Sequence, residues 1–600
     1  MYQYLLHKVK WLAWYTKTKI NYRVKKHTIT MSLGNFKGNQ GTANVYISAN
    51  GNGIVAKFCQ IQLTPSHSNG LHDFATVSDA VLPIDLSSLT FHRDGIYESE
   101  WFVRWITIDK KQNQRFNIYK WIKPDIHYSS REDTNLPQDE NSQCTLTREK
   151  HLAKKRHEYE FDLYQNDPFV PVKKYILYPA LITDISQAFI RYTHRFPERW
   201  TSFNQITKAY HMYFKTPTGI DHWEDDQHFA QQRLNWCNWS LIERVVSKAV
   251  LQNMMTVDEI RLNKLMSEGI IEMISQDRLF VTNLKMTDGL GIPSPVVLFQ
   301  QTTHSGLVPV AIQLNQPEDK SHETNPVFYP DDDTNVWKLA KMWCNLADSS
   351  IHLGIVHLGL THLLMEGVNI SMHRNLSSRH PVYKLLAPHF HYTLAINELA
   401  RLDLLGPGEY VDRIIKIKSA GVLLELGKKL EVWRMDIDGT LPADLRKRGL
   451  LYPEENENEK INLPGFFYAE DGLRLYYAIR EYVDEYVRYY YCGEEDNETK
   501  RRLLDDAEIH AFCRELQKPR AFVDGGIGIK GVPSTNNKFE TIEQLTDTVT
   551  SIIYTCSVMH AATNYPMYDE YGFPPNYSTM LHKEPPSDAV RYLFQCFELL

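Results

Sequence analysis

The spacing of three histidines inside one long helical stretch most constrains what this chain can fold into. His352, His357 and His362 are each five residues apart, within a stretch predicted to be helical over residues 336–366. At about 1.5 Å per residue this helix would be about 45 Å long, a length that normally crosses the middle of a large domain. Residues five apart in a regular α-helix are turned about 140° from each other. The spacing therefore predicts a π-bulge that brings His357 and His362 to the same side.

A second helical stretch adds two polar side chains to a buried face. It begins with the capping box Thr541-Ile-Glu-Gln544 and stops before Pro566. Its apolar positions repeat at helical spacing, and the repeat continues through His560 and Asn564. Neutral imidazole binds Fe, Zn, Cu and Ni, so the clustered histidines predict a metal site. The alternative interpretation is a set of histidines held by hydrogen bonds in an ordinary core.

The first part of the chain has the pattern of strands. Apolar and polar residues alternate over residues 45–49 and 101–105, which predicts an antiparallel β-sandwich over residues 27–122. Residues 123–147 are polar and contain two prolines, which predicts a linker, and helical periodicity dominates residues 148–600. Because 600 residues exceed what one hydrophobic core serves, the expected fold class is multidomain α+β: an N-terminal sandwich followed by a large, mainly α-helical domain.

Charge and cysteine usage indicate the compartment and the partners. Residues 1–72 hold nine basic side chains and no acidic one, although the whole chain has a net charge of −7. This excess suits anionic lipid headgroups better than nucleic acid, unless the cluster is incidental. Residues 1–26 are predicted to form a flexible basic leader. Eight scattered cysteines without a CxxC pair fit a reducing compartment, and no uninterrupted apolar run reaches the roughly 18 residues that span a bilayer. We expect a cytoplasmic chain that associates reversibly with membranes.

These motifs together resemble the lipoxygenase family. The resemblance is carried by the run Trp337-Lys-Leu-Ala-Lys341, by the histidines at 352, 357, 362, 380 and 389, by Ile396-Asn397, and by His560-Ala-Ala-Thr-Asn564. The strand-rich front, with Gly41-Thr-Ala-Asn-Val-Tyr46, is similar to the PLAT β-sandwich of the same family. The resemblance covers residues 27–587. It implies membrane contact through the sandwich, which could also hold Ca²⁺.

The resemblance implies one non-haem iron. Its imidazole ligands would be His357, His362 and His560, with Asn564 as a weak or variable oxygen ligand. The motif histidines that are not ligands in the family, and that would support the ligands or fill the core, are His352, His380 and His389.

The resemblance also implies a reaction. In the family, ferric hydroxide takes a hydrogen from the CH2 between two cis double bonds of a polyunsaturated fatty acid, and O2 then adds to the pentadienyl radical. Ala400 matches a position at which alanine accompanies S products, so an S hydroperoxide is expected. Arg401 could meet the substrate carboxylate or form a salt bridge. The apolar positions that match the fatty-acid channel, or that are ordinary core, are Leu358, Leu363, Ile396 and Leu404.

Two positions depart from the family pattern. Leu353 stands where the family has glutamine after the first motif histidine, and losing such support to a metal ligand typically costs about 10 to 100-fold in affinity or activity. Family chains continue further and end in a carboxylate that ligates iron. Here Leu600 follows His560 by 40 residues, so we expect that its carboxylate does not reach the metal and that the C-terminal part of the domain is missing. The alternatives are a catalytically silent lipid-binding protein and a hydroperoxide isomerase on the same iron scaffold.

Overall fold

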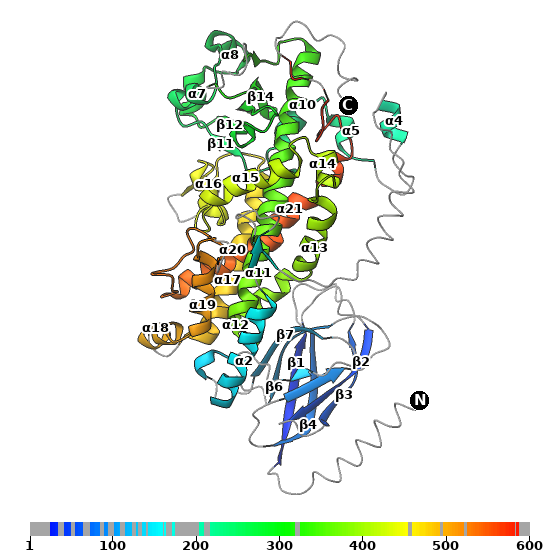
Figure 1. Ribbon diagram of the computed structural model, residues 1–600, viewed down its shortest axis with the longest axis vertical. Helices are drawn as coiled ribbons and strands as arrows, with labels where there is room; N and C mark the ends of the chain where they lie inside the picture. The colour runs from blue at the N-terminus through cyan, green and yellow to red at the C-terminus, as the bar shows by residue number, and fades with distance from the viewer. Residues whose placement is uncertain are drawn as a thin grey trace. The chain divides into compact units, whose positions relative to one another are not determined.

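The computed structural model (Figure 1) describes most of the chain in two compact units. The described residues are 24–33, 41–49, 54–63, 73–83, 89–93, 101–108, 115–122, 128–129, 135–139, 142–159, 161–163, 171–173, 203–208, 216–317, 325–453, 459–492, 496–520, 525–582 and 584–586. Residues 1–23 of the predicted leader and the C-terminal residues 587–600 therefore lie outside them, whereas residues 24–26, also assigned to the leader, belong to a strand. One unit comprises residues 1–154, 375–388 and 505–509, and the other comprises the remaining residues.

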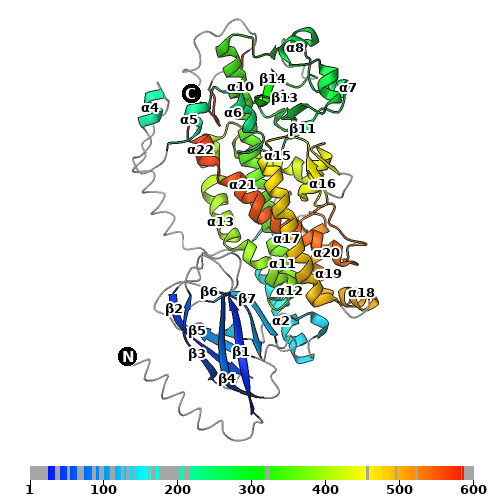
Figure 2. The ribbon, with the colours of Figure 1, turned by 180° about the vertical axis from the view of Figure 1, so that it is seen from behind.

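The first unit contains the predicted β-sandwich. Its strands form two four-stranded sheets, in the orders β4-β1-β6-β7 and β3-β2-β5-β8, and neighbouring strands run antiparallel. Figure 2 shows the two sheets from behind. The prediction of an antiparallel sandwich is confirmed. The strands are β1 (Val24–Leu33), β2 (Gly41–Ala49), β3 (Ile54–Leu63), β4 (Asp73–Pro83), β5 (Leu89–Arg93), β6 (Trp101–Ile108), β7 (Arg115–Ile122) and β8 (Tyr128–Ser129).

Segments from far along the chain complete this first unit. Helix α2 (Ser142–Glu158) begins inside the segment predicted as a linker. Its Arg148 forms a salt bridge with Glu508, whose carboxylate also accepts a hydrogen bond from the Ser377 backbone N–H at 2.8 Å. Helix α12 (Pro381–Leu386) follows in the same unit. Buried ion pairs and hydrogen bonds thus join residues more than 350 positions apart.

The second unit is built on one long helix. It runs without a break through α10 (Thr334–Ile351), the π-helix η6 (His352–Leu364) and α11 (Met365–Asn375). The Asp333 side chain caps its start by accepting hydrogen bonds from the backbone N–H groups of Asn335 and Val336. These 42 residues are long and apolar enough to cross a membrane by length and composition, but 78% of the apolar window is buried inside the protein. That burial is typical of a core helix.

A five-stranded antiparallel sheet, which the sequence did not lead us to expect, lies in the second unit. Its order is β11-β12-β13-β14-β15. Helices α7, α8 and α9 contribute Leu251, Leu262 and Met273 to a core shared with its strands. The elements are β11 (Ile242–Arg244), β12 (Leu279–Asn283), β13 (Val296–Thr302), β14 (Gly306–Gln313), β15 (Val327–Phe328), α7 (Lys248–Met254), α8 (Glu259–Leu265) and α9 (Ile270–Ser275).

The π-helix is packed closely by a neighbouring helix, α15 (Lys418–Val432). A Cβ at Gly359 would lie 2.5 Å from Leu426 Cδ1, and one at Gly354 would lie 3.0 Å from Val422 Cγ2. Real Cβ atoms do not tolerate the first distance, so the absence of a side chain at Gly359 lets the two backbones approach. Close packing of this kind holds η6 in place.

A second interrupted helix approaches η6 from another direction. It consists of α20 (Ile542–Tyr554), the π-turn η9 (Thr555–Met559) and α21 (His560–Asn564), and it begins with the predicted capping box of Thr541 and Gln544. Further elements of this unit are α4 (Phe203–Lys208), α5 (Gly219–His222), α6 (Asp226–Gln231), η5 (Lys285–Thr287), α13 (Thr393–Leu399), η8 (Ala400–Leu404), α14 (Tyr410–Ile414), α16 (Leu441–Lys447), α17 (Phe467–Tyr491), α18 (Asp496–Leu504) and α22 (Met567–Tyr571), with the short strands β9 (Phe161–Leu163), β10 (Pro171–Lys173), β16 (Leu451–Pro453) and β17 (Glu459–Ile461). Helix α19 (Ala507–Gln517) begins in the first unit and continues in the second.

Candidate metal centre

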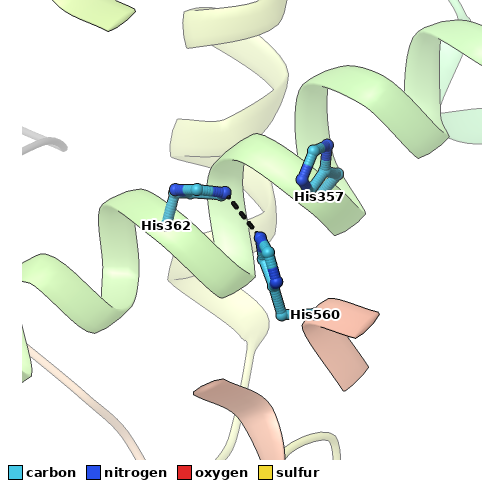
Figure 3. Close-up of side chains that lie close together, drawn as sticks. All are labelled: His357, His362 and His560. Carbon is cyan, nitrogen blue, oxygen red and sulfur yellow. Dashed lines mark hydrogen bonds between the residues drawn. The ribbon is translucent and has the colours of Figure 1, made fainter. Parts of the chain in front are cut away.

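The π-helix aligns two of the three spaced histidines, as the spacing predicted. Thirteen residues, His352 to Leu364, have π-helical hydrogen bonding, and one extra residue in each turn brings residues five apart to the same side. The rings of His357 and His362 accordingly lie 5.1 Å apart between centroids and are nearly perpendicular, at 72°. Figure 3 shows both rings on the same side of the helix.

His560 completes a group of three imidazoles. It is the first residue of α21, and its ring centroid lies 5.3 Å from that of His357 and 4.8 Å from that of His362. The Nε2 atoms of His560 and His362 are 2.9 Å apart, the contact drawn as a dashed line in Figure 3. One ring nitrogen from each histidine lies within 4.8 Å of the other two. Two separate helices therefore present three nitrogen donors to one small volume.

The surroundings favour the neutral form of these imidazoles, which is the form that binds a metal. Burial, reinforced by the neighbouring imidazoles, lowers the pKa of His357 to about 2. The same two causes lower the pKa of His362 to about 4, and burial lowers the pKa of His560. The buried Nε2 of His357 has no hydrogen-bond partner. A buried nitrogen lone pair without a donor is costly unless a cation or a solvent molecule meets it.

Asn397 fixes which nitrogen of His362 is available. Its amide Nδ2 donates to the carbonyl oxygen of His362 at 3.0 Å and to the carboxylate of Glu366 at 2.8 Å. Both partners only accept, so the amide oxygen faces His362 Nδ1 at 3.0 Å and that nitrogen must carry the proton. His362 Nε2 is then unprotonated, and it faces His560 and the volume that the three rings share.

Sequence reasoning did not assign a role to Asn397 or to Glu366, which are both fully buried. Asn397 belongs to the Ile396-Asn397 motif that resembles the family, but the sequence indicates no role for its side chain. Its partner His362 is 35 residues away in the sequence, so no local spacing pointed to the contact. A buried asparagine within a helix is the signal that could have been followed, because such an amide needs several hydrogen-bond partners.

The other motif histidines are held by protein groups. His352 is fully buried, with Nε2 2.9 Å from the Thr563 carbonyl oxygen and Nδ1 2.8 Å from the Tyr571 hydroxyl. His380, in the first unit, caps helix α12 and its Nε2 lies 2.9 Å from the Asp506 carboxylate. His389 is half-buried, and burial lowers its pKa to about 4.

The remaining predicted site residues differ in exposure. Asn564 is half-buried, one turn after His560 in the same helix. Arg401 is buried and donates to Glu366 and to Glu398, each at 2.7 Å. Leu353, at the position of the family glutamine, is half-buried. Among the predicted substrate positions, Leu363 and Ala400 are buried, Leu358 is half-buried, and Ile396 and Leu404 are exposed.

A cavity of about 80 Å³ lies beside the two interrupted helices. Ile351, Ile355, Val356 and Leu360 line it from α10 and η6, and Tyr554, Thr555 and Met559 line it from α20 and η9. Its lining does not include the predicted substrate positions.

Comparison with known proteins places both parts of the chain. Residues 184–597 match the lipoxygenase family model, which is more than half of the chain, and residues 28–136 match the PLAT/LH2 domain model. The allene oxide synthase-lipoxygenase protein of Plexaura homomalla is 28% identical over 563 residues, which cover 84% of this chain and 50% of that protein. Polyunsaturated fatty acid lipoxygenase ALOX8 of Mus musculus is 31% identical over 406 residues, which cover 65% of this chain and 55% of that protein. The matches thus span about half the length of these relatives.

A solved structure agrees over nearly the whole chain. The crystal structure of coral 8R-lipoxygenase, described as activated by calcium through a C2-like domain, has 26% sequence identity and a TM-score of 0.69, and it covers 96% of this chain and 87% of that chain. The fold, the two matching domain models and the grouped histidines agree. This chain belongs to the lipoxygenase family, with an N-terminal PLAT domain.

Proposed function

We propose that this chain binds one non-haem iron and inserts O2 into polyunsaturated fatty acids to give S hydroperoxides. The ligands would be His357, His362 and His560, with Asn564 as a weak oxygen ligand. The observation that carries the proposal is the convergence of three ring nitrogens within 4.8 Å of one another. When bound there, iron supplies the one-electron oxidation that removes a hydrogen from the CH2 between two cis double bonds, after which O2 adds to the carbon radical.

The donor set suits iron. Imidazole nitrogens bind iron. Iron oxygenases use few protein ligands, so that coordination positions stay open for exchangeable ligands. His357 supplies a buried nitrogen without a protein partner, and His362 supplies a nitrogen whose lone pair is set free by the Asn397 hydrogen bond. Metal-binding histidines generally donate their other N–H to a fixed acceptor, and Asn397 has this role for His362.

Buried residues of this chain would hold the proposed ligand His362 in position. Glu366 accepts hydrogen bonds from Asn397 and from Arg401. This buried chain of contacts fixes the amide that orients His362. We assign Arg401 to this support rather than to the substrate carboxylate, because two carboxylates already engage its guanidinium. Leu358, Leu363, Ile396, Ala400 and Leu404 remain our proposed fatty-acid contacts, with Ala400 directing O2 to give the S product.

The PLAT domain would bring the enzyme to its substrate. We propose that the sandwich binds membrane surfaces reversibly from the cytoplasm, where polyunsaturated acyl chains are available, and that it can hold Ca²⁺. The coral relative described as calcium-activated supports the second point. The boundaries expected from the sequence are a leader over residues 1–26, the sandwich over 27–122, a linker over 123–147 and the catalytic domain from 148. Because β1 begins at Val24 and β8 pairs with β5 through Ser129, we propose a sandwich over residues 24–129 instead.

One experiment tests the proposal. Purified protein loaded with ferrous iron should hold about one iron per chain by mass spectrometry and should form conjugated dienes with linoleate or arachidonate while consuming O2. Chiral chromatography of the hydroperoxide then tests the S configuration. Protein that binds iron but consumes added hydroperoxide without O2 uptake would instead be an isomerase.

A second function is favoured by one observation. Leu353 cannot supply the amide that the family glutamine provides, so the iron shell has one hydrogen-bonding side chain fewer. A catalytically silent protein that keeps the scaffold and binds lipid would show no stoichiometric iron, yet it would still bind fatty acid. Iron content after incubation with ferrous iron separates the two functions, and equilibrium binding of a fluorescent fatty acid to the metal-free protein verifies that the silent form still binds lipid.

A further inference from the structure

A tyrosine is hydrogen-bonded to the histidine next to the proposed ligands. Tyr571 ends helix α22, and its hydroxyl lies 2.8 Å from His352 Nδ1. The other ring nitrogen, Nε2, lies 2.9 Å from the carbonyl oxygen of Thr563. A carbonyl can only accept, so Nε2 carries the proton and Nδ1 presents a lone pair. Tyr571 therefore donates its phenolic proton to Nδ1 of His352, while Nε2 donates to the Thr563 carbonyl.

Three stacked rings lead from this tyrosine to a proposed ligand. The ring of Tyr571 lies 5.8 Å from that of His352, with an interplanar angle of 17°. The ring of His352 lies 6.4 Å from that of His357, at 15°. Near-parallel aromatic rings at this spacing form a short path for an electron. The phenol of Tyr571, its proton acceptor His352 and the proposed metal ligand His357 thus lie in one row.

A second tyrosine extends the row away from the histidines. The ring of Tyr577 lies 5.0 Å from that of Tyr571, and its hydroxyl donates to the Asp348 carboxylate at 2.5 Å. Asp348 is buried and lies 3.3 Å from the guanidinium of Arg233, which is also buried. Both tyrosines therefore have an internal base.

We infer that Tyr571 is a redox-active residue that reduces oxygen-centred fatty-acid radicals formed at the metal centre. The inference rests on the proposed function, because the centre must generate the oxidant, a fatty-acid alkoxyl radical. The phenolic O–H bond of Tyr571 breaks, its proton forms an N–H bond at His352 Nδ1, and its electron passes through the rings of His352 and His357. The alkoxyl radical takes that electron and a proton from water, so that a hydroxy fatty acid and hydroxide form and a neutral tyrosyl radical remains. The ligand histidines are thereby spared from oxidation.

The chain offers a matched control in Tyr468. Tyr468 is half-buried like Tyr571, but its hydroxyl faces the hydroxyl of Tyr554 at 3.1 Å rather than an imidazole or a carboxylate. A second phenol is a poor proton acceptor near neutral pH. Tyr468 should therefore be harder to oxidise than Tyr571 in the same protein.

The first test uses metal-free protein, so that it does not depend on iron. A flash-quenched ruthenium complex removes one electron from the protein, and electron paramagnetic resonance follows the tyrosyl radical. Because Tyr577 also has an internal base, the variants are made in a Tyr577→Phe background. We expect a long-lived component in Tyr577→Phe alone and after Tyr468→Phe is added, and its loss after Tyr571→Phe is added. An unchanged long-lived component in Tyr571→Phe would overturn the inference. Circular dichroism and thermal melting verify that each variant is folded.

The second test needs no substitution at Tyr571 and covers the case in which that variant fails to fold. Ferrous-loaded wild-type protein is mixed with linoleate hydroperoxide and a nitroso spin trap, and trypsin peptides are mapped by mass spectrometry. The trap should be attached to Tyr571. Attachment to ligand histidines, or to exposed Tyr565 but not to Tyr571, would contradict the relay. Failure to bind iron would contradict the proposed function alone, since the metal-free test decides the role of Tyr571 separately.

Discussion

The two interrupted helices that meet at the histidines use π-geometry differently. In the long helix, thirteen π-helical residues include both His357 and His362, so the π-geometry itself aligns the two donors. In α20–η9–α21 the π-turn ends just before His560. There it sets the direction of the donor that follows. The π-geometry thus extends over several turns of the first helix, whereas in the second helix it is confined to the single π-turn η9.

This difference decides which residues are buried. Leu545, Val549 and Ile552 of α20 are fully buried. Beyond the π-turn the buried position is Thr563, whereas His560 and Asn564 are half-buried. The prediction that one regular helix keeps the same buried face through His560 and Asn564 is therefore wrong after residue 554, where the π-turn begins. The rotation turns His560 out of the core and toward the other two imidazoles.

Removing a single proposed iron ligand, from either of the two helices, should cause the strongest loss of function. His357→Ala and His560→Ala should each abolish stoichiometric iron binding and dioxygenase activity, because each removes one of three nitrogen ligands. Iron content by mass spectrometry and O2 uptake are the measurements. His304→Ala, at an exposed turn residue, serves as the control. Full iron occupancy in either variant would contradict the assignment of the substituted histidine as an iron ligand.

Removing the support of His362 should cost less. Asn397→Ala takes away the acceptor that fixes the His362 tautomer and leaves the buried Glu366 with fewer donors. We expect a loss of about 10 to 100-fold in iron affinity or activity. Competition with a chelator gives the affinity. Gln252→Ala, a change at an exposed amide on α7, should have no effect, and equal affinities for Asn397→Ala and the wild type would remove Asn397 from the site.

The close packing of the long π-helix can be tested at Gly359. Gly359→Ala places a Cβ against Leu426, and such overpacking should lower the free energy of unfolding by about 1–3 kcal/mol. Urea unfolding of the metal-free protein measures it. In the double variant with Leu426→Ala the two losses should be less than additive, because the clashing atom is gone. Additive losses would show that the contact does not constrain η6.

Acid should destabilise the metal-free protein through its neutral buried histidines. The folded-state pKa values of His352 and His389 are about 4, below the value of about 6.5 for an unfolded chain. Between these limits the unfolded state binds more protons, so stability is complete above about pH 6.5 and falls as the pH drops toward 4. Each histidine contributes a slope of at most about 1.4 kcal/mol per pH unit. His389→Gln should flatten the dependence of the free energy of unfolding on pH, and an unchanged slope would contradict the burial of its imidazole.

The smallest effect concerns the product. Ala400→Gly should shift part of the hydroperoxide from S toward R while iron content stays the same, and added backbone freedom should cost about 0.5–1 kcal/mol of stability. Chiral chromatography detects the shift. An unchanged product ratio would remove Ala400 from the path of O2.

Much of this architecture could be predicted from the sequence, for identifiable reasons. The five-residue histidine spacing indicated a π-bulge, because a regular α-helix cannot align such residues; the structure extends this geometry over thirteen residues. The Thr541–Gln544 capping box marked a helix start through local hydrogen bonds that depend on nearby residues only. The antiparallel sandwich followed from alternating apolar residues, and its PLAT identity from the resemblance to the family.

Other features had no local signature. The strands β12 and β13 are buried along nearly their whole length, so they lack the alternation that identifies a half-exposed strand. The π-turn η9 lies inside a stripe whose spacing fits a regular helix. Asn397 acts on a residue 35 positions away, and only the folded chain brings the two together.

The central claim is that three imidazoles from two helices share one iron. Anomalous diffraction at the iron absorption edge, from crystals of iron-loaded protein, tests this claim most directly. We expect one strong peak within bonding distance of ring nitrogens of His357, His362 and His560. A peak elsewhere, or one that lacks any of these three nitrogens, would contradict it.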